Sequence, residues 1–163
     1  MTDQATTGRI AIHGNGEGDA LWMLGGLYEV RLSGAETGGA VTMIEFTVPE
    51  GMGPPPHMHD VDETVYILEG TAKYHANGTT TDVGPGSVLF IPRGAQETFE
   101  PTTNLRMLGV YSPAGGMEKF FAEAGERAQR REVPPPPTGP PDVERLVAIG
   151  SRHGLTLVAP PGH

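Results

Sequence analysis

The chain has 163 residues and no internal repeat, which predicts a single domain. It carries 11 Lys and Arg against 20 Asp and Glu, and the resulting net charge of −9 argues against nucleic acid or an anionic membrane surface as a partner. It has no cysteine, so disulfides and thiolate ligands are excluded, and no apolar run approaches the roughly 18 residues of a membrane span.

The first 35 residues are predicted to form an N-terminal arm. Residues 1–8 are polar and lack the charged-then-apolar layout of a signal peptide, so we expect a cytoplasmic protein. The 24 glycines and 16 prolines of the chain separate short apolar runs, which is typical of an all-β sandwich or barrel. The arm would pack on a barrel formed by residues 36–113. The predicted strands of the arm are residues 9–12, 21–24 and 27–33. A further strand, within residues 40–48, is predicted in the barrel.

A run of three prolines leads into two histidines. Pro54–Pro56 is restricted to an extended path and would hold His57 with little conformational freedom. Residues i and i+2 of a strand face the same side, so His57 and His59 can aim both imidazoles at one point. Glu63 can reach that point from the next stretch of strand. Two imidazoles and one carboxylate form a facial triad that suits a divalent first-row metal with open coordination positions.

Short strands continue after the histidines. Glu63, Val65 and Ile67 share one face of a predicted strand, so the two aliphatic side chains would line the same interior as the metal. Glu97 and Phe99 likewise share a face. Many short antiparallel strands at close spacing predict a small closed barrel of jelly-roll architecture. The predicted strands are residues 63–69, 71–76, 79–83 after an Asn77–Gly78 hairpin turn, 87–91, and the last strands within 97–111.

The pattern changes in the C-terminal segment, residues 114–163. Apolar side chains at helical spacing predict an amphipathic helix over 117–130, with its phenylalanines docked on the barrel exterior. Prolines between residues 134 and 141 form a stiff spacer. Asp142 is placed to cap a short helix at 143–149, and residues 155–158 are a candidate strand. We expect this tail to pack on the barrel or on a partner subunit.

Two motifs carry a family resemblance. Residues 51–70 have the pattern G-x5-H-x-H-x3-E-x6-G, which matches the first motif of the cupin family at every fixed position. The second motif, G-x5-P-x-G-x2-H-x3-N, is matched at Gly86, Pro92 and Gly94, but Glu97 replaces its histidine and Pro101 its asparagine. The chain thus resembles small single-domain bacterial cupins of the quercetinase-like group. The resemblance implies an all-β fold, a single-domain cupin jelly-roll β-barrel with short C-terminal helices.

Glu97 stands where the family has its fourth metal ligand. As a ligand beside His57, His59 and Glu63, it would favour Fe, Mn or Ni, with Zn or Cu as alternatives. It could instead stay outside the coordination sphere and leave a three-ligand site, or act as a base near the substrate with its pKa raised by burial. In a further alternative the metal site is lost and the pocket only binds a small molecule, or Glu97 is exposed.

The resemblance implies a metal-dependent dioxygenase that acts on a small aromatic or enolisable substrate, with Glu63 and Glu97 as catalytic residues. In quercetinase-like cupins, which open a flavonol ring with O2 and release carbon monoxide, the glutamate matching Glu63 can ligate the metal and accept the substrate's hydroxyl proton. Two alternatives stay open: a redox-neutral isomerase, lyase or cyclase, and a non-catalytic small-molecule-binding barrel. A homodimer is expected by analogy. The apolar walls are predicted at Val65, Ile67, Phe99 and Met107.

Overall fold

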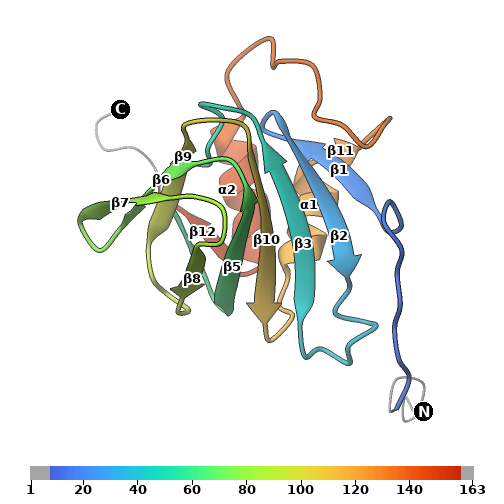
Figure 1. The fold of residues 1–163 in the computed structure, drawn as a ribbon. Helices are drawn as coiled ribbons and strands as arrows, with labels where there is room; N and C mark the ends of the chain where they lie inside the picture. The colour runs from blue at the N-terminus through green and yellow to red at the C-terminus, as the bar shows by residue number, and fades with distance from the viewer. Residues whose placement is uncertain (1–7, 159–163) are drawn as a thin grey trace.

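The structure is a computed structural model that describes residues 8–158. Figure 1 shows two sheets that curve around a common interior, with two helices beside them. The strands are β1 (Ala20–Met23), β2 (Gly26–Leu32), β3 (Thr42–Val48), β4 (His57–His59), β5 (Asp62–Glu69), β6 (Ala72–Ala76), β7 (Thr79–Val83), β8 (Val88–Ile91), β9 (Glu97–Pro101), β10 (Leu105–Ser112), β11 (Glu126–Arg127) and β12 (Leu155–Leu157), and the helices are α1 (Met117–Ala124) and α2 (Val143–Arg152).

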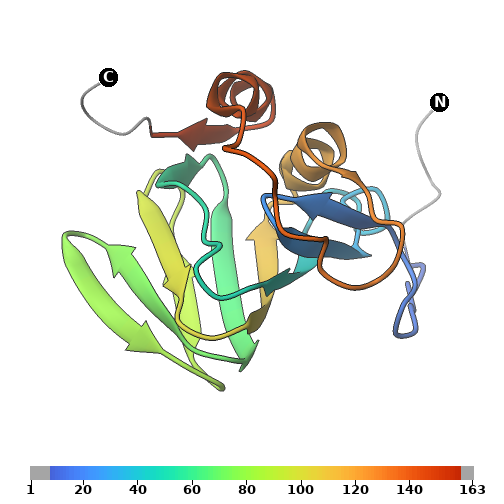
Figure 2. The ribbon, with the colours of Figure 1, turned by 90° about the horizontal axis from the view of Figure 1, so that it is seen from above.

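The strands form two antiparallel sheets. One has seven strands in the order β11-β1-β2-β3-β10-β5-β8, and the other has five in the order β12-β4-β9-β6-β7. Seen from above in Figure 2, the two sheets face each other across the core, and α1 and α2 lie on the side where β1 and β12 are found. Consecutive strands that alternate between the sheets give the jelly-roll barrel that the motifs predicted.

Side-chain alternation fixes which face of each strand points inward. In β3, Ile44, Phe46 and Val48 are buried while the residues between them are half-buried. β10 pairs with β3 along its whole length and buries Leu105, Met107 and Tyr111 in the same way. A one-residue slip between these strands would turn every core side chain to the outside, so burial itself holds the register. The register in turn places the site residues.

Two glycine positions show why the turns are where the sequence predicts them. Asn77 and Gly78 both have positive φ angles, 53° and 72°, as a two-residue hairpin between β6 and β7 requires. Gly70, the last fixed position of the first motif, has φ +82°, and a Cβ there would lie 2.1 Å from the carbonyl oxygen of Asn104. The motif glycine is therefore needed for both its conformation and its close packing.

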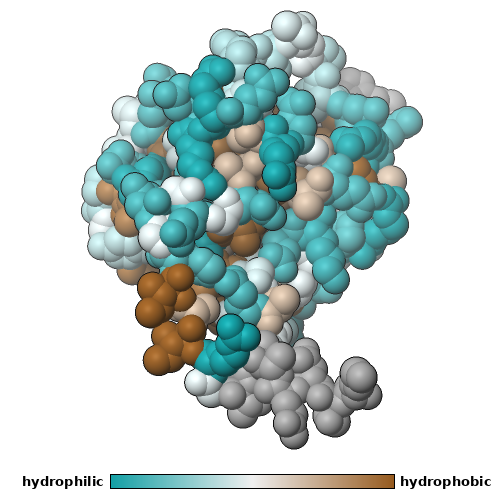
Figure 3. Space-filling model, turned by 90° about the vertical axis from the view of Figure 1, so that its right-hand side faces the viewer, coloured by the Kyte–Doolittle hydropathy of each residue, from teal (hydrophilic) through white to brown (hydrophobic). Residues whose placement is uncertain are grey.

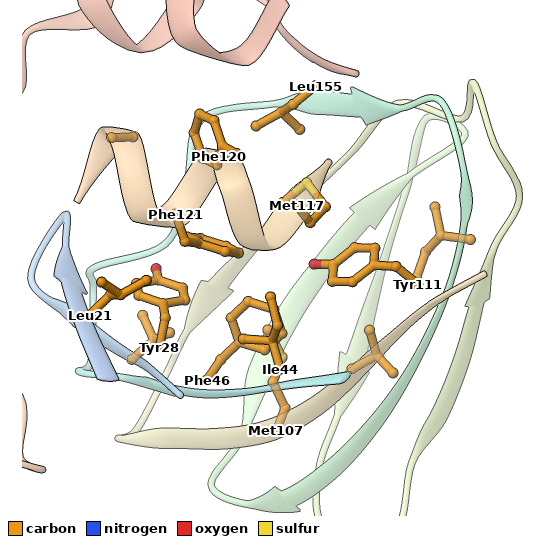
Figure 4. Packing of buried hydrophobic residues seen from close by; sticks show 14 of the residues in the cluster. Leu21, Tyr28, Ile44, Phe46, Met107, Tyr111, Met117, Phe120, Phe121 and Leu155 are labelled. Atoms are coloured by element: carbon orange, nitrogen blue, oxygen red, sulfur yellow. The ribbon is translucent and has the colours of Figure 1, made fainter. Parts of the chain in front are cut away.

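The predicted helix over 117–130 is half as long in the structure. α1 ends at Ala124, and β11 then pairs with β1. Gly125 permits this turn, because a Cβ there would lie 2.7 Å from the carbonyl oxygen of Trp22. The expected exterior docking of the phenylalanines is wrong. Phe121 stacks on Tyr28 with ring centroids 4.5 Å apart, and Figure 4 shows Phe120, Phe121 and Met117 directed from α1 into the core.

The chain ends differ in how they match the sequence prediction. Residues 9–12 form no strand, and Ile10 and Ile12 are more than four-fifths exposed. The face drawn in Figure 3 is mostly hydrophilic, with one hydrophobic projection low in the view. The predicted strands at 21–24, 27–33 and 155–158 are confirmed by β1, β2 and β12. The predicted cap of α2 is also confirmed, because the Asp142 carboxylate accepts a hydrogen bond from the Arg145 backbone. Residues 1–7 of the predicted arm lie outside the described residues.

Within residues 8–158, no helix is both long and apolar enough to cross a membrane. The division into an arm of residues 1–35, a barrel of 36–113 and a tail of 114–163 stays a prediction. Strands from both flanking segments are hydrogen-bonded into the sheets of the barrel.

Replacing Phe121 with alanine should destabilise the fold by about 3–5 kcal/mol, because it removes a buried ring that stacks on Tyr28 and touches Phe46. Urea unfolding followed by circular dichroism measures the change. Phe90→Ala is the matched control, since Phe90 is 65% exposed on β8 and its truncation should cost about 0.5 kcal/mol or less. Equal losses in the two variants would contradict the central position of α1.

Candidate metal centre

Three strands hold the two histidines in place. β4 is only three residues long, and its burial alternates so that His57 and His59 face inward while Met58 lies between them. His57 pairs with Glu97 of β9 on one side. On the other side, β12 pairs with β4 in antiparallel register, and Val158 donates a hydrogen bond to the carbonyl of Pro56. Because a lone three-residue strand has few bonds of its own, β4 depends on both neighbours for its position.

The side chains of His57, His59 and Glu97 meet at one point. Their potential ligand atoms all lie within 4.8 Å of one another, and all three residues are buried. Glu97 Oε1 lies 3.3 Å from His57 Nε2 and 3.4 Å from His59 Nε2. Such a set of two imidazole nitrogens and a carboxylate oxygen matches the donors that divalent first-row metals bind. The reading of Glu97 as an exposed residue is therefore wrong.

Glu63 lies beside this cluster rather than within it. Its Oε2 atom is 3.1 Å from His59 Nε2, and the residue is 4% exposed. The sequence pattern placed Glu63 together with the two histidines, whereas in the structure Glu97 contacts both histidines and Glu63 contacts His59. Glu63 touches the cluster through His59. Whether Glu63 is a ligand or a proton acceptor stays a prediction.

One hydrogen bond fixes the orientation of the His57 ring. Its Nδ1 lies 2.9 Å from the carbonyl oxygen of Pro55, which can only accept a hydrogen bond, so Nδ1 carries the proton. Nε2 then has its lone pair free and faces Glu97. A backbone carbonyl commonly orients a metal-ligating histidine in this way. The triproline segment thus has a second role beyond stiffness, because it supplies this acceptor.

Several buried atoms at the site have no hydrogen-bond partner among residues 8–158. They are both ring nitrogens of His59 and Oε2 of Glu63. The contacts of 3.1–3.4 Å bring His59 Nε2 close to both carboxylates without hydrogen-bond geometry. Orphaned polar atoms in a protein interior are costly unless something pairs with them. A cation bound at the cluster would satisfy His59 Nε2 and Glu63 Oε2, so the residues present fit a divalent metal.

The charges at the site shift its pKa values in different directions. Burial would raise the pKa of Glu97, but the adjacent His57 and His59 imidazoles outweigh it and hold that pKa at about 2. Burial raises the pKa of Glu63, with the negative charge of Glu97 adding to the shift and His59 opposing it. Burial acts to lower the pKa of His59, but the two carboxylates raise it to about 9. The two carboxyl groups are therefore shifted in opposite directions, the pKa of Glu97 downward and that of Glu63 upward.

The cluster forms one wall of a cavity of about 70 Å³ inside the barrel. All four predicted apolar wall residues line this cavity, and α1 closes part of it with Met117, Phe120 and Phe121. Their part in substrate binding stays a prediction. The predicted wall residues are Val65, Ile67, Phe99 and Met107.

Three tyrosines in the cavity wall, Tyr28, Tyr74 and Tyr111, were missed in the sequence. The Tyr111 ring lies 5.3 Å from that of His59, and Tyr111 pairs with Glu63 across β10 and β5. Burial raises the pKa of Tyr111 well above its usual value, and the charges of Glu63 and Glu97 add to that. The Tyr74 hydroxyl is buried and has no hydrogen-bond partner within the described part of the chain. Strand parity with Met107 would have found Tyr111.

Comparison with known proteins supports this architecture. The family model described as "Cupin domain" matches residues 44–111. Quercetin 2,3-dioxygenase of Bacillus subtilis is 28% identical over 114 residues, which cover 69% of this chain and 34% of that protein. The transcriptional activator RhaS of Klebsiella pneumoniae is 32% identical over 87 residues, covering 53% of this chain and 31% of the activator. The chain thus spans about a third of the length of these relatives.

Comparison with solved structures also finds proteins of similar fold. The polyketide cyclase RemF of Streptomyces resistomycificus is 29% identical with a TM-score of 0.50, over 59% of this chain and 68% of that one. An RmlC-like cupin of Shewanella frigidimarina is 16% identical with a TM-score of 0.55, over 62% of this chain and 89% of the other, and shows likeness of fold alone. With a jelly-roll barrel, inward-facing motif residues and a domain model that matches residues 44–111, the barrel of this chain is similar to the cupin domain.

Proposed function

We propose that the protein is a metal-dependent enzyme that acts on a small aromatic or enolisable substrate, with ring-opening dioxygenation of the quercetinase type as its reaction. The observation that carries the proposal is the convergence of His57, His59 and Glu97 on one point of an otherwise apolar cavity. The relationship to quercetin 2,3-dioxygenase across 69% of the chain supports the choice of reaction. Fe, Mn or Ni fits the donor set, with Zn or Cu as alternatives.

His57, His59 and Glu97 would hold the metal. Glu97 keeps its negative charge at neutral pH, because the two imidazoles hold its pKa at about 2. A bound divalent ion would supply Lewis acidity, which lowers the pKa of a substrate hydroxyl or polarises a carbonyl. The backbone of Pro55 keeps the His57 ring in the orientation that faces the cluster.

Glu63 has the environment of a general base. Burial raises its pKa, and a raised pKa makes a carboxylate a stronger base toward a substrate hydroxyl. Its position beside His59, at the margin of the cluster, leaves one of its oxygens without a partner among the described residues. In the proposed reaction Glu63 takes the proton of the substrate's hydroxyl group. The two carboxylates thus have separate proposed roles: Glu97 would hold the metal and Glu63 would move the proton.

A redox-neutral reaction, such as a cyclisation, is the second candidate. Two observations favour it: Glu97 replaces the histidine of the cupin motif, and the polyketide cyclase RemF is 29% identical at a TM-score of 0.50. In this case Glu63 would again remove a proton from the substrate, and no oxygen would be consumed. Binding without turnover is the third reading, since the regulator RhaS is also a relative.

Replacing either His57 or His59 with alanine should remove stoichiometric metal while leaving the barrel folded, because the barrel is stabilised mainly by apolar burial. Elemental analysis of protein purified without added metal, with circular dichroism as the folding check, measures this. His75→Ala is the matched control, since His75 lies on β6 and its Nδ1 is 2.8 Å from the Thr80 hydroxyl, away from the cluster. Full metal content in the His57 and His59 variants would reject the site.

Glu97→Gln keeps the side-chain shape but removes the charge, so metal affinity should fall about tenfold or more. Glu97→His restores the ligand set of the cupin motif and should retain metal. A competition titration with a chromogenic chelator measures both affinities. Glu100→Gln, an exposed position on the same strand, controls for a loss of one acidic charge. If Glu97→Gln changes neither metal affinity nor turnover, the three-ligand reading with Glu63 would replace the present one.

The metal-loaded protein should consume O2 and release carbon monoxide in equal amounts when given quercetin. An oxygen electrode and a haemoglobin assay for carbon monoxide measure the two gases. Glu63→Gln should lower the rate while metal content stays close to that of the parent protein, because the base is lost and the metal cluster remains. Conversion of an enolisable aromatic polyketide without oxygen uptake would establish the redox-neutral reaction instead. Binding without conversion of either compound would indicate a small-molecule-binding protein without enzymatic activity.

A further inference from the structure

We propose that a groove beneath the proline-rich segment is a second part of the substrate site and binds the apolar, aromatic end of the substrate. This strap groove lies between the β1–β2 turn, the loop of residues 51–55 and the strap of residues 134–142. In Figure 1 the strap arches over the end of the molecule toward which β3 runs. The inference rests on the proposed function, because it assumes that the reactive end of the same substrate lies at the metal centre.

The size of the inner cavity is the first argument. About 70 Å³ is well below the roughly 300–1,000 Å³ of sites that enclose drug-sized ligands. It can take a few non-hydrogen atoms, which is enough for the oxygen-bearing end of an aromatic substrate but not for several rings. The strap groove has about 1050 Å³. A substrate of two or three rings therefore needs space outside the cavity, and the groove provides it.

The two spaces share a wall. Met23, at the end of β1, lines both the inner cavity and the strap groove. Pro54 lines the cavity and its neighbour Pro55 lines the groove, so the segment that leads to His57 separates them. Methionine is unbranched and adapts its shape readily. Met23 thus borders both spaces, and a substrate that reaches from the groove to the metal centre would lie against it.

Leu24 gives an independent indication of a binding role. It occupies a turn position with a positive φ angle of 49°, a conformation that bulky side chains rarely adopt and that glycine or asparagine would suit better. Gly25 follows with φ 80°, as such a turn requires. Strained non-glycine residues are found preferentially at functional sites. The Leu24 side chain lines the groove, which gives a reason for a leucine at this position.

The chemistry of the groove selects a neutral aromatic ligand. Its inner surface includes Trp22, Leu24, Met52 and the strap prolines. The cationic group of Arg145 is already engaged, because its guanidinium donates hydrogen bonds to the backbone carbonyls of Glu123 and Ala124. The strap is attached at both ends: the Trp22 indole donates to the Glu132 carbonyl at 2.7 Å, and Asp142 caps α2. The groove is fixed and its lining is more apolar than polar, with Glu126 and Asp142 as its acidic members, so it suits flat, uncharged rings.

Two test compounds separate the groove from the metal centre. 3-Hydroxyflavone carries the oxygen-bearing ring together with further rings, and 3-hydroxy-4-pyranone carries the oxygen-bearing ring alone. Calorimetric titration of the metal-loaded protein gives both affinities. Trp22 is the only tryptophan of the chain and lines the groove, so its fluorescence follows flavone binding independently of turnover.

Leu24→Asn suits the positive φ angle and removes the apolar side chain from one wall, and Met52→Ala truncates another wall. Each should weaken 3-hydroxyflavone binding about fivefold or more and leave 3-hydroxy-4-pyranone binding unchanged. Val88→Asn is the matched control, because Val88 is 67% exposed on β8 and should alter neither affinity. Thermal unfolding of each variant shows that the fold is kept, and the second variant serves if the first does not fold.

Equal affinities of parent and groove variants for 3-hydroxyflavone would overturn the proposal, as would a parallel loss for both compounds or no binding of the flavone to the parent. The proposed reaction can fail separately. If the parent binds the flavone through the groove but neither consumes O2 nor converts a substrate, the groove stands and the enzymatic function is rejected. If His57→Ala removes metal and pyranone binding but keeps weak, Leu24-dependent flavone binding, the groove acts independently of the metal.

Discussion

The structure is organised around four ionisable side chains that are buried at one end of an apolar barrel. His57, His59, Glu63 and Glu97 are each less than a tenth exposed. Charged groups are held in such an interior only when they pair with one another or with a cation. Paired strands on both sides of β4, the backbone acceptor at Pro55 and the close approach of β9 all serve to bring these groups together. The surrounding walls can then remain apolar.

Much of the barrel could be predicted because its signals are local. Alternation of apolar residues, the Asn77–Gly78 turn and the motif spacing identify strands and their inward faces within a few residues. Interactions between distant segments were invisible in the sequence. Neither the pairing of β12 with β4 nor the turn of the chain at Gly125 into β11 has a local signature. The same limit explains α1, whose amphipathic spacing predicts a buried face without saying that this face enters the barrel interior.

The site itself was predicted in composition better than in arrangement. Strand parity placed His57 and His59 on one face, and the inherited spacing placed Glu97 near them. The relative distances of the two glutamates depend on how β4, β5 and β9 cross, which parity does not give. A carboxylate in place of a histidine also changes the charge balance of the cluster. The carboxylate of Glu97 brings a negative charge to the cluster that the motif's histidine would not.

The pairing of β12 with β4 joins residues 155–157 to residues 57–59, which precede them by most of the barrel sequence. During synthesis from the N-terminus, the histidine strand emerges early but lacks one of its two flanking strands until residues 155–157 have left the ribosome. Contacts of such long sequence separation form late and slowly. The arrangement of the four site residues is therefore completed only after residues 155–157 have been synthesised, and nascent chains that stop before β12 would expose an incompletely paired edge. Maturation with metal would accordingly follow, rather than guide, the assembly of the barrel.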